Sequence, residues 1–300
     1  MASGSKKPTK NTEPPLRILC FGNSLTCGYP VGNPYATRLA QKIEDAFPGR
    51  TVECEVEGMP GDLVTTGQYI DRMKASWDLA DHPFDWTIVL GGTNFRFPDL
   101  SRHHRYRQTP RETSQYLNTL PTSSAPKPDL TDLSPSDLGW GKPADQIIEG
   151  LKRAWDIPLS KGGKVLALTI LETKGIFRSI SERRREVNDA IKSYERDNFF
   201  HFDLFKALPY HQMAPYDRAK YWDPDGVHLQ AAGYDLMGDK IGDALVRILR
   251  LAEAQDTDIS SVVWDARQRK AIEELIFEEE MGDPRLLSQG YIVVRKKDLD

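Results

Sequence analysis

Residues 17–28 have the sequence RILCFGNSLTCG, and this stretch decides the class of fold. Its apolar start is too short for a helix and is interrupted at once by Gly22, so it predicts a strand followed by a tight turn. Ser24 lies on that turn, at the carboxyl end of the strand, where open α/β sheets bind ligands and where a nucleophile can reach a substrate. The alternative is that Ser24 only hydrogen-bonds its own turn or caps a following helix, because small polar residues are common in turns.

A histidine near the other end of the chain favours chemistry at Ser24. Residues 221–229 have the sequence YWDPDGVHL, in which Asp225 precedes His228 by three residues. A neutral imidazole can accept the proton of a serine hydroxyl, and a carboxylate on its other nitrogen fixes the tautomer and stabilises the imidazolium. One local turn therefore offers a base and the group that orients it, although His228 taken alone fits a structural loop histidine better than a catalytic base.

Two further turns follow predicted strands in the same way. Residues 57–62, EGMPGD, follow the strand-like TVECEV, and residues 90–94, LGGTN, follow the strand-like DWTIVL. Gly61 allows its backbone N–H to approach a ligand closely, and the Asn94 side chain carries an NH2 group. Both groups are suitable donors for an oxyanion.

Ser24 in GNSL, Gly61 in MPGD, Asn94 in GGTN and His228 in DGVH occur in the order of the four sequence blocks of the SGNH (GDSL-type) hydrolase family. The chain resembles that family over roughly residues 16–250. The resemblance implies a three-layer α/β/α fold with a five-stranded parallel sheet of the flavodoxin-like kind. It also implies that Ser24 is the nucleophile, His228 the base and Asp225 its orienting residue. The oxyanion hole would consist of the Ser24 N–H, the Gly61 N–H and the Asn94 side chain.

Two positions depart from the usual pattern of that family. Asn23 stands where the usual Gly-Asp-Ser-Leu motif has an acidic residue, and Phe95 stands where an acid usually follows the Asn of the third block. Asn23 can still hydrogen-bond around its turn, but it carries no charge. We expect both changes to shift the local electrostatics without removing the reaction.

Length and composition exclude several classes of protein. The chain of 300 residues is long enough for one α/β domain with extensions. A formal net charge of -4 is small for this size, so nothing indicates a nucleic-acid partner. The three cysteines, Cys20, Cys27 and Cys54, are expected to be buried free thiols, and without metal-ligand spacing we expect neither a metal nor a cofactor. No apolar run fits a secretory signal or a membrane span, which predicts a cytoplasmic protein.

The rest of the chain alternates between strand and helix patterns. This alternation predicts one domain, residues 16–252, with a parallel sheet, helices on both faces, and all strand ends at one edge. The predicted strands are 17–21, 51–56, 85–90, 164–171 and 199–205. The predicted helices are 33–47, about 62–79 with Asp62 as a candidate N-cap, 144–157, 181–197 and 229–252.

Three segments lie outside this alternation. Residues 1–15 are polar and contain prolines, so we expect a disordered leader. The insertion 95–141 begins directly after Asn94 and contains the basic, aromatic run RHHRYR at 102–107. That run either binds an acidic or polar acyl group or is simply a solvated surface. Residues 253–300 either dock on the domain or exchange between the chains of a homodimer.

These observations favour a serine esterase that hydrolyses a carboxylic ester of a small molecule or sugar, with an acetyl or other short acyl group, through an acyl-enzyme. An acyltransferase that uses the same Ser24, His228 and Asp225 is the first alternative, because the resembled family includes acyltransferases. A non-catalytic binding protein on the same fold is the second alternative, and only Asn23 and Phe95 support it.

Overall fold

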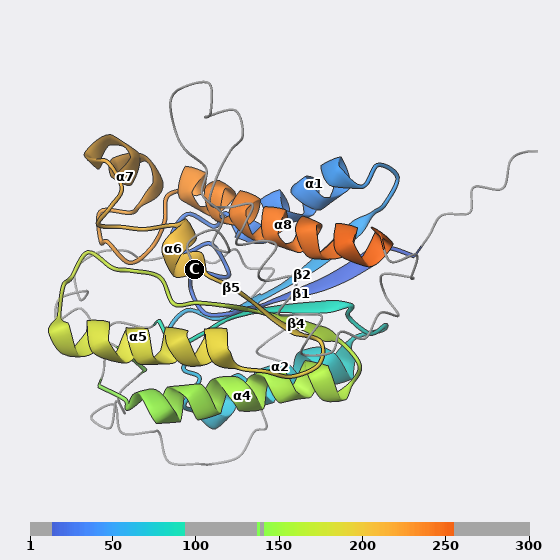
Figure 1. The fold of residues 1–300 in the computed structure, drawn as a ribbon, viewed down its shortest axis with the longest axis horizontal. Coiled ribbons are helices and arrows are strands. Elements are labelled where there is room, and N and C mark those ends of the chain that lie inside the picture. The colour runs from blue at the N-terminus through green and yellow to red at the C-terminus, as the bar shows by residue number, and fades with distance from the viewer. Residues whose placement is uncertain (1–13, 94–136, 139–140, 255–300) are drawn as a thin grey trace, which may run out of the picture.

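The computed structural model of the protein describes residues 14–93, 137–138 and 141–254. Its centre is a sheet of five strands in the order β2-β1-β3-β4-β5 (Figure 1). All neighbouring strands in the sheet are parallel, which confirms the predicted α/β fold class. The strands are β1 (Leu16–Gly22), β2 (Val52–Gly58), β3 (Trp86–Leu90), β4 (Lys164–Leu168) and β5 (Phe199–Phe202).

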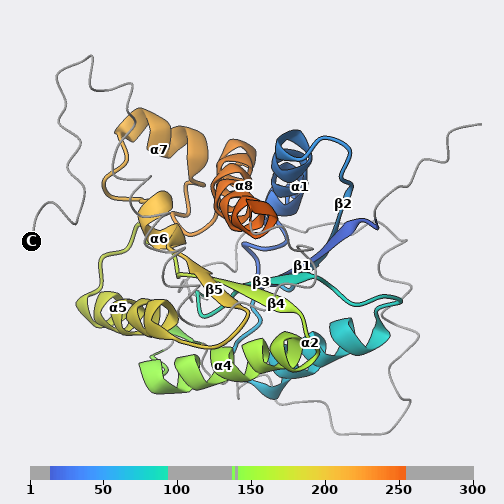
Figure 2. The same ribbon diagram turned by 45° about the vertical axis from the view of Figure 1, so that its right-hand side comes forward.

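Helices cover both faces of the sheet and form the two outer layers (Figures 1 and 2). One face carries α1 (Tyr35–Ala46) and the long α8 (Ala231–Ala254), with the short α6 (Leu204–Ala207) and α7 (Pro215–Tyr221) beside α8. The other face carries α2 (Gly67–Leu79), α4 (Ala144–Ser160) and α5 (Arg178–Ser193). The three-layer α/β/α arrangement is therefore the one that the sequence predicts.

Strand β1 connects two apolar cores. Alternate side chains of a strand point to opposite faces of its sheet. Ile18 and Cys20 pack in the core under α1 and α8, whereas Leu19 and Phe21 pack in the core under α2, α4 and α5. All of them are fully buried, which explains why the strand is a continuous apolar run and not an alternating one. The turn that follows β1 is thus supported from both faces.

The strand predicted at 164–171 is shorter in the structure. Strand β4 ends at Leu168, where its pairing with β5 ends. Two residues later, the Asn188 side chain accepts a hydrogen bond from the Ile170 N–H at 2.7 Å and donates one to the Ile170 carbonyl at 3.0 Å. A side chain of α5 therefore replaces a neighbouring strand for these backbone groups, which an apolar run in the sequence does not reveal.

The strand predicted at 199–205 also ends early, at Phe202. Asp203 follows it and caps α6, because its side chain accepts a hydrogen bond from the Lys206 N–H at 3.3 Å. The Thr169 hydroxyl, at the end of β4, donates a further hydrogen bond to the Asp203 carboxylate at 2.9 Å. The apolar residues beyond Asp203 thus belong to a short helix and not to the strand.

Asp62 is not an N-cap, contrary to the prediction. Helix α2 begins at Gly67, and Thr66 precedes it. The Asp62 carboxylate instead pairs with Arg72 from within α2, at 2.8 Å from its Nε atom. The helices predicted at 33–47, 144–157, 181–197 and 229–252 correspond to α1, α4, α5 and α8, and the sequence pattern does not predict α7.

Several predicted features lie outside the described residues, namely residues 1–13 of the leader, Asn94, Phe95, the run 102–107 and the C-terminal residues 255–300. At the end of the insertion 95–141, Asp137 and Leu138 are described and are fully buried. The Leu138 N–H donates a hydrogen bond to the Gly92 carbonyl at 3.4 Å. The insertion therefore returns to the end of β3, where it began.

The cysteines are free thiols, as predicted, but only Cys20 is buried, whereas Cys27 and Cys54 are half-buried. Within the residues that the structure describes, no helix is long and apolar enough to cross a membrane.

Candidate active site

The turn that carries Ser24 fits tightly between the ends of neighbouring strands. A Cβ atom on Gly22 would lie 2.3 Å from the Leu90 carbonyl oxygen, and one on Gly58 would lie 2.4 Å from the Cys27 backbone nitrogen. Glycine at these positions is what allows the turn to approach β2 and β3 so closely. Ser24 itself is 7% exposed, so this close packing leaves little of the residue in contact with solvent.

Asn23 hydrogen-bonds to its own turn. Its Oδ1 atom accepts a hydrogen bond from the Leu25 N–H at 3.3 Å, and its carbonyl accepts one from the Thr26 N–H at 3.0 Å. Asn23 is fully buried, and its Nδ2 atom has no hydrogen-bond partner among the described residues. The amide thus supplies the hydrogen bond of the turn without bringing a charge into a buried site, where an unpaired charge would be costly.

His228 and Asp225 reach Ser24 from the other end of the chain. The His228 Nε2 atom lies 3.0 Å from the Ser24 Oγ atom, and His228 Nδ1 lies 2.6 Å from Asp225 Oδ2. The carboxylate accepts a hydrogen bond from the Nδ1–H group, and in this tautomer the Nε2 lone pair faces the serine hydroxyl. The structure therefore brings together the three residues that the sequence singles out, in a geometry suited to proton transfer from Ser24 to His228.

The pKa of Asp225 lies below its ordinary value. Partial burial alone would raise this pKa, but hydrogen bonds from the His228 ring and from the backbone N–H groups of Val227 and His228 outweigh that effect. Those N–H groups donate to Asp225 Oδ1 at 2.8 and 2.9 Å. Asp225 is therefore ionised at neutral pH and available to stabilise an imidazolium.

The turn that holds Asp225 and His228 is stabilised on both sides. The Asp223 N–H donates a hydrogen bond to the His228 carbonyl at 2.9 Å, and the Asp225 N–H donates one to Asp223 Oδ1 at 3.1 Å. The Lys174 N–H, in the loop after β4, donates to the Gly226 carbonyl at 2.8 Å. The imidazole and the carboxylate thus keep their relative positions through the backbone of one short turn.

The ring of Tyr29 packs against His228. The two ring centroids are 4.9 Å apart in an edge-on arrangement, and Tyr29 is 40% exposed. The Tyr234 hydroxyl, in α8, donates a hydrogen bond to the Tyr29 carbonyl and so fixes this residue. Sequence reasoning misses Tyr29, because nothing in the pattern around it links it to a histidine almost two hundred residues away.

Two of the three predicted oxyanion donors lie in the described residues. Gly61 has a positive φ of 81° and is exposed at the turn after β2. Within residues 14–93, 137–138 and 141–254, neither its N–H nor that of Ser24 donates a hydrogen bond. Asn94, the third predicted donor, lies outside the described residues and directly follows Thr93, which is buried.

Another histidine, His211, has different hydrogen-bond partners from those of His228. Its Nε2 atom lies 2.9 Å from the Thr173 carbonyl, and its N–H donates to the Glu172 carboxylate at 3.0 Å. Among the described residues, no group of His, Cys, Asp or Glu side chains is arranged to hold a metal ion.

A parallel α/β sheet with a serine, an imidazole and a carboxylate joined at its carboxyl edge is the arrangement of hydrolases that use a serine nucleophile. A comparison with protein-family models matches residues 20–236 to the GDSL-like Lipase/Acylhydrolase family. Because this match spans more than half of the chain, the protein belongs to that family and is a hydrolase that acts on ester bonds.

Among solved structures, the chain is similar to several proteins whose descriptions name lipolytic or acylhydrolase families. A member of the lipolytic protein G-D-S-L family from Veillonella parvula DSM 2008 is 19% identical, with a TM-score of 0.46, and the match covers 76% of this chain and 96% of that one. The lipase/acylhydrolase from Enterococcus faecalis is 17% identical, with a TM-score of 0.48, covering 77% and 95%. No curated protein matches the sequence.

Proposed function

We propose that this protein is a serine esterase that hydrolyses the short acyl ester, such as an acetyl ester, of a small molecule or sugar. The observation that carries this proposal is the continuous chain of hydrogen bonds from Asp225 through His228 to Ser24. A serine that only capped a helix or closed its own turn would not need an oriented imidazole.

The reaction follows from these contacts in two steps. Ser24 Oγ attacks the ester carbonyl carbon, and His228 Nε2 takes the hydroxyl proton. The bond between the carbonyl carbon and the alcohol oxygen then breaks, and the imidazolium returns the proton to the leaving alcohol. A water molecule repeats the sequence on the acyl-enzyme and releases the acid. Asp225 stabilises the imidazolium in both steps.

Oxyanion stabilisation belongs to the N–H groups of Ser24 and Gly61 and to the Asn94 amide. Each donor of this kind lowers the barrier by on the order of 3 kcal/mol. Asn94→Ala should therefore lower kcat by about a hundredfold and leave the fold intact. A loss of less than about fivefold would remove Asn94 from the mechanism.

The proposal of a short acyl group is supported by the crowding around the serine. Ser24 is 7% exposed, and the centroid of the Tyr29 ring lies 4.9 Å from that of His228. Hydrolysis of chromogenic acetyl, butyryl and octanoyl esters would measure the size of the acyl pocket directly. A preference for octanoyl over acetyl would contradict the short-acyl proposal.

The serine mechanism is tested by Ser24→Ala in the same assay. We expect kcat to fall by about 10⁴-fold or more, because no other described group can replace the nucleophile. Ser160→Ala is a matched control, since Ser160 is exposed at the end of α4. Treatment with a fluorophosphonate should also add one adduct mass to the wild-type chain and none to Ser24→Ala. Undiminished hydrolysis by Ser24→Ala would overturn the proposed function.

A further inference from the structure

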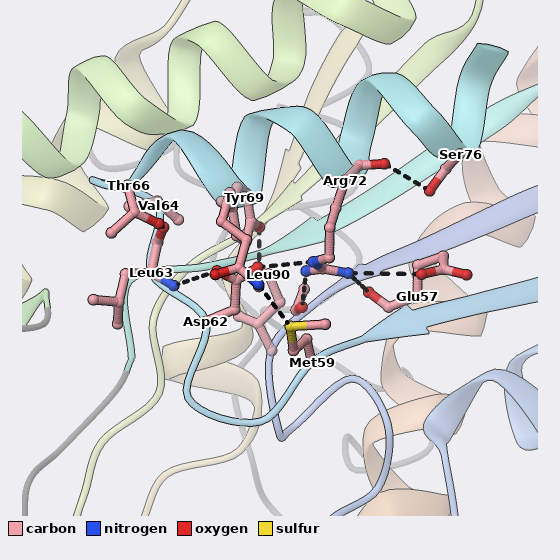
Figure 3. A network of polar contacts seen from close by, with 12 residues as sticks. Glu57, Met59, Asp62, Leu63, Val64, Thr66, Tyr69, Arg72, Ser76 and Leu90 are labelled. Atoms are coloured by element: carbon pink, nitrogen blue, oxygen red, sulfur yellow. Dashed lines mark hydrogen bonds and ion pairs between the residues drawn. The ribbon is translucent and has the colours of Figure 1, made fainter. Parts of the chain in front are cut away.

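Helix α2 reaches the ends of three strands with two side chains, Tyr69 and Arg72 (Figure 3). The Tyr69 hydroxyl donates a hydrogen bond to the carbonyl of Leu90, the last residue of β3, at 3.4 Å. Arg72 donates to the carbonyl of Gly22, the last residue of β1, from Nη2 at 2.9 Å. It also donates to the Glu57 carbonyl, near the end of β2, from Nη1 at 3.1 Å. Residues three apart on a helix share a face, which explains how both reach the same edge.

The Arg72 guanidinium also forms an ion pair with Asp62. Its Nε atom lies 2.8 Å from Asp62 Oδ2, and Asp62 Oδ1 accepts a hydrogen bond from the Leu63 N–H at 2.8 Å. The Asp62 side chain is 2% exposed and that of Arg72 is 14% exposed, so water competes little for this pair. The guanidinium also lies over the Phe21 ring, with 4.4 Å between its central carbon and the ring centroid.

The residues that Arg72 contacts are close in sequence to the two predicted oxyanion donors, the Ser24 and Gly61 N–H groups. Gly22 precedes Ser24 by two residues, and Asp62 directly follows Gly61. Nothing lies within 4 Å of the place where a Gly61 Cβ would stand, and the turn is closed by a hydrogen bond from the Asp62 N–H to the Met59 carbonyl at 3.2 Å. The hydrogen bond from the Met59 N–H to the Gly22 carbonyl, at 3.1 Å, is a further connection between the two turns.

We propose that Arg72 is a positioning residue for the oxyanion hole, holding the Ser24 and Gly61 N–H groups at a fixed separation through Gly22 and Asp62. This inference rests on the proposed esterase function. Arginine suits the task because its planar guanidinium donates in three directions at fixed angles, whereas lysine is a single flexible point charge. A displacement of about 1 Å at such a site costs about a hundredfold in rate.

Arg72→Lys is the informative variant, because it keeps a positive charge beside the buried Asp62 while a single ammonium group cannot hold the Gly22 and Glu57 carbonyls at the same time. On a chromogenic acetyl ester we expect kcat per active site to fall by about 30- to 100-fold, with KM within about threefold of the wild type. The pH dependence of kcat/KM should keep its wild-type shape, since the Asp225–His228–Ser24 contacts do not involve Arg72. Active sites are counted by fluorophosphonate labelling, so that loss of folded protein does not enter kcat.

A variant that loses stability elsewhere separates positioning from simple destabilisation. Gly238→Ala affects the contact between α1 and α8 on the opposite face of the sheet. We expect it to lower the melting temperature but to keep kcat per active site within about twofold of the wild type, because distant sites act independently. If Arg72→Lys keeps kcat within threefold of the wild type, Arg72 has no positioning role.

Amide hydrogen exchange gives a readout that does not depend on activity. In Arg72→Lys, the segment 57–66 should exchange about tenfold faster than in the wild type, while α1 and α8 remain unchanged. Absence of hydrolysis by both the wild type and Ser24→Ala would defeat the proposed function, and the exchange experiment would still decide whether Arg72 holds the turn. Unchanged exchange in 57–66 would overturn the inference.

Discussion

At the scale of single residues, the Asp225 carboxylate both orients the His228 ring and stabilises its own turn. It accepts one hydrogen bond from His228 Nδ1–H and two from backbone N–H groups. Asp225→Asn keeps an oxygen for the backbone groups but removes the charge that fixes the imidazole tautomer. We expect kcat to fall by about 10³- to 10⁴-fold with an unchanged circular-dichroism spectrum. Asp217→Asn, in the exposed α7, serves as the control and should keep wild-type activity. A loss below tenfold would remove Asp225 from the mechanism.

Tyr29 is a second residue with a testable effect, because its ring limits the orientations open to His228. An aromatic pair of this kind contributes about 0.5–1.5 kcal/mol. Tyr29→Ala should therefore lower kcat/KM by about three- to tenfold. Tyr29→Phe keeps the ring and should match the wild type. Equal losses in both variants would instead point to the hydroxyl as the active part of the side chain.

How far sequence alone predicts this site depends on how local each contact is. Ser24, Asp225 and His228 are predictable because each stands in a short motif whose chemistry is recognisable without the fold. Tyr29 and Arg72 are not, because an aromatic ring in a turn and a charged residue in an amphipathic helix resemble ordinary surface residues. Only the folded chain shows that Tyr29 packs against His228 and that Arg72 contacts Gly22 and Asp62.

At the scale of secondary-structure elements, prediction works where one face of an element is buried. Helices α1, α4, α5 and α8 all follow from apolar residues at helical spacing. Helix α7 has no buried residue, so no periodic apolar pattern marks it. Strand β4 ends near the Ile170 backbone, which hydrogen-bonds the Asn188 side chain of α5, whereas β5 ends where Asp203 caps α6. A short window of sequence contains no information about the Asn188 contact, because its partner lies in another segment.

The packing of α8 against α1 gives a prediction at this scale. A Cβ atom on Gly238 would lie 2.5 Å from the Tyr35 carbonyl oxygen, so Gly238→Ala forces the two helices apart. We expect the free energy of unfolding to fall by about 1–3 kcal/mol, although alanine is the better helix former. Gly67→Ala is the matched control, because the nearest atom to its Cβ would be 4.0 Å away, and it should not destabilise. Urea denaturation of both variants provides the comparison, and equal stability of the two would contradict the close contact.

At the scale of the whole molecule, the alternation of strands and helices predicts the layers, but side chains from distant segments determine how the strand ends meet. Arg72 connects the ends of β1 and β2 from within α2. Asp137, which lies within the predicted insertion, accepts a hydrogen bond from the Val64 N–H at 3.1 Å, just beyond the Gly61 turn. Neither link has a sequence signature, because the partners are backbone groups and any residue can supply them.

We expect Asp137 to make the stability of the fold dependent on pH. It is fully buried, its Oδ1 atom has no hydrogen-bond partner among the described residues, and burial raises its pKa to about 6. Because the pKa in the folded state is raised, the contribution of this group to stability is fully present below about pH 4, the pKa of the unfolded chain. It is lost as the pH rises through 6, and the loss amounts to about 3 kcal/mol.

Asp137→Asn removes this titration while its side-chain oxygen still accepts from the Val64 N–H. We expect the variant to be more stable than the wild type by about 1–3 kcal/mol at pH 7.5 and to match it at about pH 3, because the wild-type carboxyl is then largely protonated in both states. Urea denaturation at the two pH values measures the difference, with Asp71→Asn, exposed on α2, as the control that should show none. A variant less stable than the wild type at pH 7.5 would mean that the folded protein stabilises the Asp137 carboxylate, and the pKa would then lie below its ordinary value.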